Sequence, residues 1–310
     1  MAPDLPLDPY AASRWLGYIG LFGVIGACVF RGLIHRVTRS ARLDAETGVR
    51  LGAACRRAGV ATATLLVLAH AARLYFQART ALDPGEPMTV SAVSPWFEGV
   101  GSWGLMWSLQ MAAAGIALAG MLLAGRRLVA GWALATLGGV AAAVSMPLTS
   151  HAIESRLGSA TGVVLQGLHL LGGSVWLGTL FVLLSVTLTA TRGLPDARER
   201  AAAAVVHAYS PIALTGAGTA IGLGLVLAWL NLGSLSLLWT SAYGQALLIK
   251  MGLLVGVAAL GAWNWRRVRP ALGAAPGARR LRLSATAELL IGAALLGVTA
   301  VLVALPSPRL

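Results

Sequence analysis

Residues 160–190 read ATGVVLQGLHLLGGSVWLGTLFVLLSVTLTA and contain no Asp, Glu, Lys or Arg. Arg156 precedes this run and Arg192 follows it. A stretch of about 20 apolar residues is enough to cross a hydrocarbon core of about 30 Å as a helix. This run is longer than one crossing requires, so we expect it to tilt or to project beyond the bilayer. The stretch predicts a chain that folds in a membrane.

Seven further apolar runs lie on either side of this one, separated by short charged clusters. The whole chain is 57% hydrophobic and 11% charged, whereas a soluble domain carries about 25% charged residues. The expected spans are residues 13–34, 56–76, 102–124, 128–149, 160–190, 205–231, 243–265 and 284–305. The sequence therefore predicts an all-α integral membrane protein, a bundle of about eight transmembrane helices forming a single polytopic domain over residues 1–310.

The arginines indicate how the helices are oriented. Net charge is +13, nearly all of it from arginine, an excess that would indicate nucleic acid in a soluble protein. Here most arginines lie just outside the apolar runs, so we expect a lipid bilayer as partner and no nucleic acid. They gather in alternate connections, and basic loops stay in the cytoplasm. Both termini are therefore expected to face outward.

Histidine and methionine side chains inside the spans indicate a metal site, because polar groups in a bilayer are costly. Alternating helix direction brings these residues, from three different helices, to one depth near the outer surface. Imidazole and thioether suit Cu(I), and imidazole also suits Cu(II). The alternative is that single histidines only form hydrogen bonds between helices. The predicted metal ligands are Met146, His151, His169 and His70.

A second set of polar residues lies further inward. Lys250 is too far from either end of its span to snorkel, so it should face protein or water. It could repel cations at a gate, or neutralise a carboxylate or a cofactor propionate. Glu288 could pair with the arginines of the cytoplasmic side or belong to an ion path. The predicted path residues are Lys250, His207, Glu288 and Asn264.

The same histidines allow b-type haem as an alternative cofactor. Bis-histidine ligation needs two histidines at one depth on facing helices. His70 with His169 would serve an outer haem, and His35 with His207 an inner one. No CxxCH motif is present, which excludes covalent haem attachment.

The segment from about residue 145 to 306 resembles the CopD family of copper-resistance membrane proteins. The matching features are Ser150-His151-Ala152, LHLLGGSVWLG from Leu168, YSPIALTGAGTAIG from Tyr209, Thr240 with Tyr243-Gly244 and Lys250, Asn264 with Pro270, Glu288 and Leu305-Pro306. The family's Phe-Ser element stands here as Tyr209-Ser210. The first 140 residues match the family only in number of spans and general character.

This resemblance implies transport of copper across a bacterial inner membrane, from periplasm to cytoplasm, by a chain whose termini are both periplasmic. It also implies a periplasmic copper-binding partner of the CopC type. No DKTG phosphorylation motif or Walker P-loop is present, so hydrolysis within this chain does not drive transport and no enzyme activity is expected. Two alternatives stay open: a membrane redox protein that holds b-type haem, and an accessory subunit of a larger membrane complex.

Overall fold

A computed structural model describes residues 9–80, 82–83, 85–99, 102–126, 129–150, 158–272 and 277–305. Every regular element in these ranges is helical, and eight helices are long and apolar enough to cross a membrane. The all-helical architecture and the eight candidate spans expected from the sequence are thus confirmed.

Several spans consist of two or three consecutive helical segments. The spans are α1 (Pro9–Arg39), α2 (Ala45–Arg79), α4 (Trp103–Leu123), α5 (Val129–Ser145) with the 3₁₀ turn η3 (Met146–Thr149), α6 (Ser159–Gly173) with the π-helix η5 (Ser174–Gly178) and α7 (Thr179–Ala190), α8 (Pro195–Leu232), α10 (Ala242–Trp263) with the π-helix η6 (Asn264–Val268), and α11 (Gly277–Ala304). The short connecting elements are α3 (Val90–Val93), η1 (Ser94–Phe97), η2 (Ala124–Arg126), α9 (Leu237–Thr240) and η7 (Arg269–Ala271).

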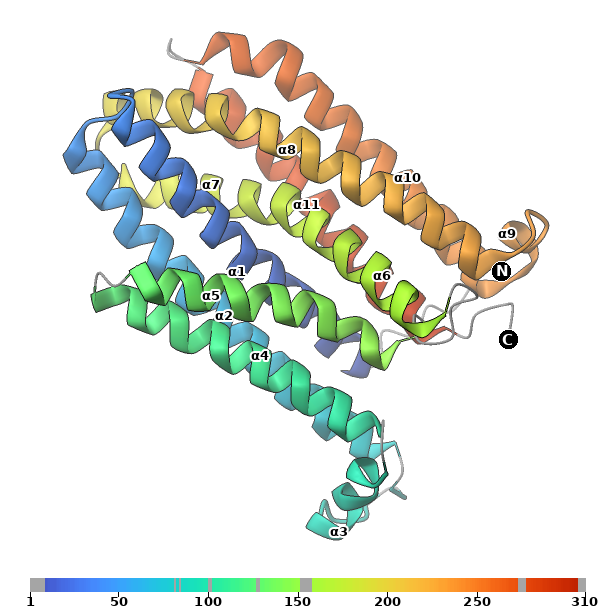
Figure 1. The fold of residues 1–310 in the computed structure, drawn as a ribbon. Helices are drawn as coiled ribbons and strands as arrows, with labels where there is room; N and C mark the ends of the chain where they lie inside the picture. The colour runs from blue at the N-terminus through green and yellow to red at the C-terminus, as the bar shows by residue number, and fades with distance from the viewer. Residues whose placement is uncertain are drawn as a thin grey trace.

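Helix α1 lies at the centre of the bundle. It packs against α2, α5, α7, α8 and α11, while α4 pairs with α5 and α10 pairs with α11 (Figure 1). In the most apolar part of α1, 72% of residues are buried, compared with 11% in α8. A helix that is apolar on all sides but barely buried by protein matches a lipid-facing position. The central helix and its neighbours therefore position the polar groups described below.

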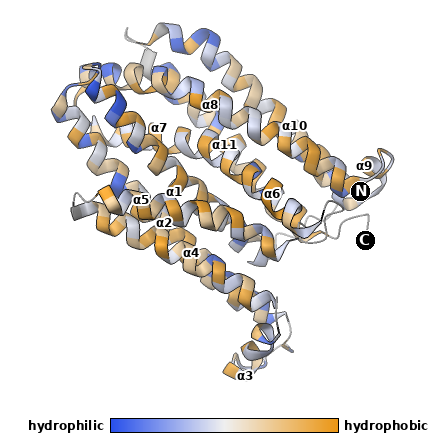
Figure 2. Cartoon of the chain, viewed as in Figure 1, coloured by the Kyte–Doolittle hydropathy of each residue, from blue (hydrophilic) through white to orange (hydrophobic). Residues whose placement is uncertain are grey.

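Hydrophilic residues gather at the end of the bundle that contains the α1–α2 connection, whereas the helix bodies are mostly apolar (Figure 2). Arg36 and Arg39 lie in the last turn of α1 at this end. The assignment of this end to the cytoplasm stays a prediction from the positions of the arginines.

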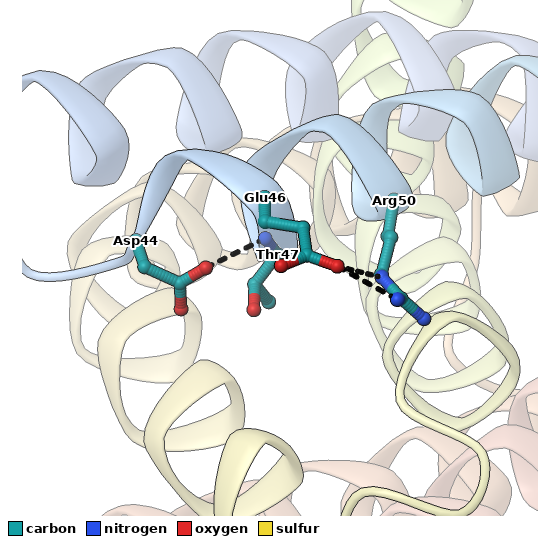
Figure 3. Close-up of polar contacts among 4 residues, drawn as sticks. All are labelled: Asp44, Glu46, Thr47 and Arg50. Atoms are coloured by element: carbon teal, nitrogen blue, oxygen red, sulfur yellow. Dashed lines mark hydrogen bonds and ion pairs between the residues drawn. The ribbon is translucent and has the colours of Figure 1, made fainter.

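Asp44 caps the N-terminus of helix α2, which begins at Ala45. Its side chain accepts a hydrogen bond from the Thr47 backbone N–H at 2.8 Å (Figure 3), which satisfies one of the free donors of the first turn. The same bond holds the pKa of the Asp44 carboxyl below its usual value. One turn on, Glu46 pairs with Arg50 at 2.7 Å, an exposed contact that contributes little to stability. The cap therefore defines the start of α2.

Glycines allow α1 to cross its neighbours at close range. A Cβ at Gly26 would overlap the carbonyl of Gly178 in η5, and a Cβ at Gly178 would overlap the carbonyl of Phe22. At Gly20 a Cβ would lie 2.8 Å from the backbone of Leu66 in α2. Small residues at helix crossings are the means by which membrane helices pack without a hydrophobic driving force.

Candidate functional site

A small cavity lies where α1, α2, η3 and α6 meet. Its volume is about 20 Å³, room for a water molecule or a single ion. The residues that line it and could act chemically are Arg14, Tyr18, His70, Arg73, Met146 and Gln166. Two of the four predicted metal ligands, His70 and Met146, are thus brought together.

His70 lines this cavity and keeps one ring nitrogen in a form that can bind metal. Its side chain is 2% exposed, and Nδ1 lies 2.9 Å from the Leu66 carbonyl oxygen. Because a carbonyl can only accept, Nδ1 carries the proton and Nε2 keeps its lone pair. Nε2 is buried and has no hydrogen-bond partner. A carbonyl that orients the other ring nitrogen is the usual second-shell arrangement of metal-binding histidines.

Met146 approaches the same space from η3. Gly17 of α1 lies between Met146 and His70: the position of a Cβ there would be 3.7 Å from Met146 Cε and 3.9 Å from His70 Cε1. The Met146 and His70 side chains therefore both approach the bare backbone of Gly17, and both line the cavity. Met146 begins the 3₁₀ turn η3, and Pro147 is its second residue.

His169 is not among the residues that line this cavity. Its Nδ1 lies 2.7 Å from the Ala220 carbonyl oxygen, and its ring packs on Gly224 of α8. Gln166 and Leu170 of the same helix line the cavity instead, and successive helical residues differ by about 100° around the axis. His169 therefore faces α8, although its Nε2 keeps the lone pair as in His70.

His151 lies outside the described residues. Within the parts of the chain that the structure describes, no group of three His, Cys, Asp or Glu side chains is arranged to hold a metal ion. Among the described residues, the cavity offers one imidazole and one thioether.

Two buried arginines stand beside the cavity. Arg73 donates to Gln110 Oε1 at 2.8 Å and to Thr149 Oγ1 at 2.5 Å, and both Arg73 and Arg14 donate to the Tyr10 hydroxyl. Their guanidinium carbons lie 4.9 Å (Arg14) and 5.6 Å (Arg73) from the centre of the Tyr10 ring. Among the described residues, neutral oxygens and an aromatic face, rather than carboxylates, stabilise these two charges.

The expectation from sequence did not include Arg14, Gln110 or Tyr18. A signal was present, because Arg14 and Gln110 are strongly polar residues within the apolar runs 13–34 and 102–124, and such residues point to interior sites. Their mutual contacts are not apparent from the sequence, since they depend on the rotation of each helix about its axis.

A second polar cluster surrounds Glu288, which is 4% exposed. Asn264 Nδ2 donates to Glu288 Oε2 at 3.0 Å, and the Trp176 side chain is a further hydrogen-bonding neighbour of this carboxyl. Gly261 leaves room for Oε1, 3.5 Å from where its Cβ would lie. Among the described residues Glu288 forms no ion pair with arginine, contrary to one expectation for it.

Two π-helical segments meet at this carboxyl. Trp176 belongs to η5, and Asn264 is the first residue of η6. The Tyr209 hydroxyl donates to the Trp176 carbonyl oxygen at 2.7 Å. Single-turn π-helices inside α-helices are frequent at functional sites. Glu288 is therefore a second candidate functional residue, in addition to the cavity beside His70.

The remaining predicted residues lie apart from both clusters. His207 and His35 are exposed, and Arg269 Nε donates to His207 Nδ1 at 3.1 Å. Lys250 is half-buried and acts electrostatically on His169. It has no hydrogen bond or ion pair to another described side chain.

These positions give no support to the haem alternative. Within the described part of the chain, His70 lines the cavity and His169 does not, because His169 bonds to Ala220 of α8. In the second pair, His207 Nδ1 accepts from Arg269, so its Nε2 carries the proton and cannot ligate iron in that state. The residues present therefore do not fit bis-histidine haem.

Family models match both the segment that contains the cavity beside His70 and the segment that contains Glu288. The model of copper resistance protein D matches residues 203–302, which contain Asn264 and Glu288. The model of the copper resistance protein D-like N-terminal domain matches residues 4–160, half of the chain, which contain His70 and Met146. The relationship thus extends over the first 140 residues, where sequence inspection found only general likeness.

A curated relative, the copper transport protein CutJ of Bacillus subtilis, is 35% identical over 164 residues. This match covers 52% of the present chain and 28% of the relative, so the chain spans less than a third of that protein's length. No solved structure matches. With half of its length matched by one family model and a further hundred residues by the other, the chain belongs to the CopD copper-resistance family.

Proposed function

We propose that this chain carries copper across the bacterial inner membrane, from the periplasm to the cytoplasm, and that the cavity beside His70 is the entry site. The observation that carries the proposal is the buried His70 Nε2, which has no hydrogen-bond partner and belongs to a side chain that lines the same small cavity as Met146. Membership of a copper-resistance family and likeness to a copper transport protein support copper as the cargo.

The donor set favours Cu(I). A neutral imidazole and a thioether are soft ligands that bind Cu(I) without the carboxylates that hard cations require. Leu66 fixes the tautomer of His70, and Gly17 keeps the space between the two donors open. Because both donors are neutral, binding need not release a proton at this site.

The onward path in this proposal passes His169 and Lys250 and then Glu288. His169 offers a second imidazole with a free Nε2, and Lys250 places a positive charge near it. A cation beside that charge is bound weakly, which favours release over retention. Glu288 is the only acidic side chain in the buried set of the described chain. His207 lies further toward the cytoplasmic end on α8.

We also propose that copper is delivered by a periplasmic copper-binding protein of the CopC type. A cavity with room for a single ion suits transfer from a partner's site, because the ion must shed its hydration shell on entry. Energy for transport has to come from outside the described helices, since no nucleotide-binding motif is present.

The test removes the two donors separately. His70→Ala and Met146→Leu should each weaken Cu(I) binding by roughly 10- to 100-fold or more, at least the loss seen when a second-shell partner is removed. Affinity is measured on detergent-purified protein by competition with a Cu(I) chelator. His35→Ala, an exposed histidine on α1, is the matched control and should bind as the wild type does.

Cellular copper accumulation tests transport as distinct from binding. His70→Ala and His169→Ala should both reduce it, and His35→Ala should not. Unchanged affinity in both donor variants would rule out the entry site, and unchanged accumulation in both histidine variants would rule out the path. A visible spectrum of the same purified protein should show no Soret band.

A further inference from the structure

Arg14 has more hydrogen-bond donors than the protein satisfies. Its side chain lines the cavity and is only 9% exposed. One nitrogen, Nη2, donates to the Tyr10 hydroxyl and to the Thr149 carbonyl oxygen, but Nε and Nη1 are buried without a hydrogen-bond partner. Leaving buried donors of a charged group unpaired is costly. A missing acceptor is therefore expected beside Arg14.

The charges around the cavity also indicate that an acceptor is missing beside Arg14. Arg14 and Arg73 both line it, and their acceptors are the neutral oxygens of Tyr10, Thr149 and Gln110. No carboxylate among the described residues forms an ion pair with either guanidinium. A copper ion at His70 would add a third positive charge to this poorly solvated space, and like charges there repel strongly.

We infer that the cavity binds one small anion of the size of chloride, held by the unpaired N–H groups of Arg14 and adjacent to the copper donors His70 and Met146. A volume of about 20 Å³ gives room for one small ion such as a halide. The anion offsets one of the two arginine charges, so that Cu(I) meets a net charge of one rather than two in the cavity. The role of the anion toward copper rests on the proposed function, whereas its binding to Arg14 does not.

The experiment measures anion binding on copper-free, detergent-purified protein. Thermal unfolding is followed in chloride and in isethionate, a bulky sulfonate, at equal ionic strength. Chloride should raise Tm by about 2–4 °C through preferential binding to the folded state. Arg14→Gln should abolish this rise, and Arg39→Gln, which alters an exposed arginine at the other end of α1, should keep it.

A second measurement covers the case in which Arg14→Gln does not fold. The ³⁵Cl NMR line of a chloride solution should broaden on addition of the wild-type protein, and added bromide should reverse the broadening. No Tm difference and no broadening would overturn the inference, as would a chloride-dependent rise that persists in Arg14→Gln.

Failure of this inference is distinguishable from failure of the proposed function. His70→Ala should lose Cu(I) binding yet keep the chloride-dependent rise in Tm, because Arg14 is intact. Wild-type protein that binds Cu(I) but shows no chloride effect would refute the anion site alone. Protein that shows the chloride effect but binds no Cu(I) would refute the copper site alone.

Discussion

Asn264 donates a hydrogen bond from Nδ2 to Oε2 of Glu288 at 3.0 Å, joining the end of α10 to the middle of α11. The amide oxygen of Asn264 is buried and has no partner. An uncharged donor accommodates the carboxyl as an anion and leaves its other oxygen able to hold a proton or contact a cation. This relationship makes Glu288 a buried acidic side chain whose hydrogen-bond donor is uncharged.

Replacing Glu288 with Gln should reduce copper transport but leave copper binding beside His70 unchanged. Copper accumulation should fall by about tenfold or more, equivalent to about 1.4 kcal/mol on the rate-limiting barrier, because the buried acid of the path is lost. Cu(I) affinity of the purified protein should stay unchanged, since His70 and Met146 are untouched. Glu46→Gln, an exposed acid on α2, is the control, and equal accumulation in the two variants would exclude Glu288 from the path.

Lys250 should weaken copper binding at His169. Lys250→Met removes a positive charge that acts on this imidazole, so the fraction of copper retained by the purified protein should rise, with an effect on affinity on the order of tenfold. Lys250→Arg keeps the charge and should behave like the wild type. The measurement is Cu(I) titration in a His70→Ala background, which isolates the inner donor. A lower affinity in Lys250→Met would contradict this role.

Gly26 and Gly32 offer a matched pair on α1. Alanine is the better helix former by about 1 kcal/mol, and Gly32 has no atom within 4 Å of a new Cβ. Gly32→Ala should therefore leave Tm unchanged or raise it. Gly26→Ala should lower stability by about 1–3 kcal/mol, because its Cβ overlaps the Gly178 carbonyl and forces the helices apart. Thermal unfolding in detergent checks both, and similar Tm values would show that α1 and η5 do not cross this closely.

Asp44 should make stability depend on pH at the acidic end. The Thr47 N–H lowers the pKa of the Asp44 carboxyl in the folded state below its ordinary value of 3.8. The charged cap therefore stabilises α2 fully above pH 3.8, and this contribution is lost as the pH falls through the folded pKa. Asp44→Asn, which caps equally well without ionising, should show a smaller fall in Tm on acidification. Asp44→Ala should have a lower Tm at neutral pH, and identical pH profiles for wild type and Asp44→Asn would refute the assignment.

The sequence alone determined the number of helices that could span a membrane, because length and apolarity are local properties set by the thickness of the hydrocarbon core. It also showed which polar residues occur within the spans, including His70, Lys250 and Glu288, and it carried the resemblance to the CopD family. Each of these follows from a short stretch of chain. None requires knowledge of which helices are neighbours.

Tertiary structure decided which of those residues meet. His70 and Met146 share a cavity. His169 faces α8 because its Nδ1 bonds to the Ala220 carbonyl oxygen, whereas Leu170, about 100° further round the same helix, lines the cavity. The convergence of Arg14 and Arg73 on Tyr10 depends on the close packing of α1 and α2, and the contact between Asn264 and Glu288 on the packing of α10 against α11. Helix rotation and crossing arise from contacts between segments distant in the chain, so no local pattern specifies them.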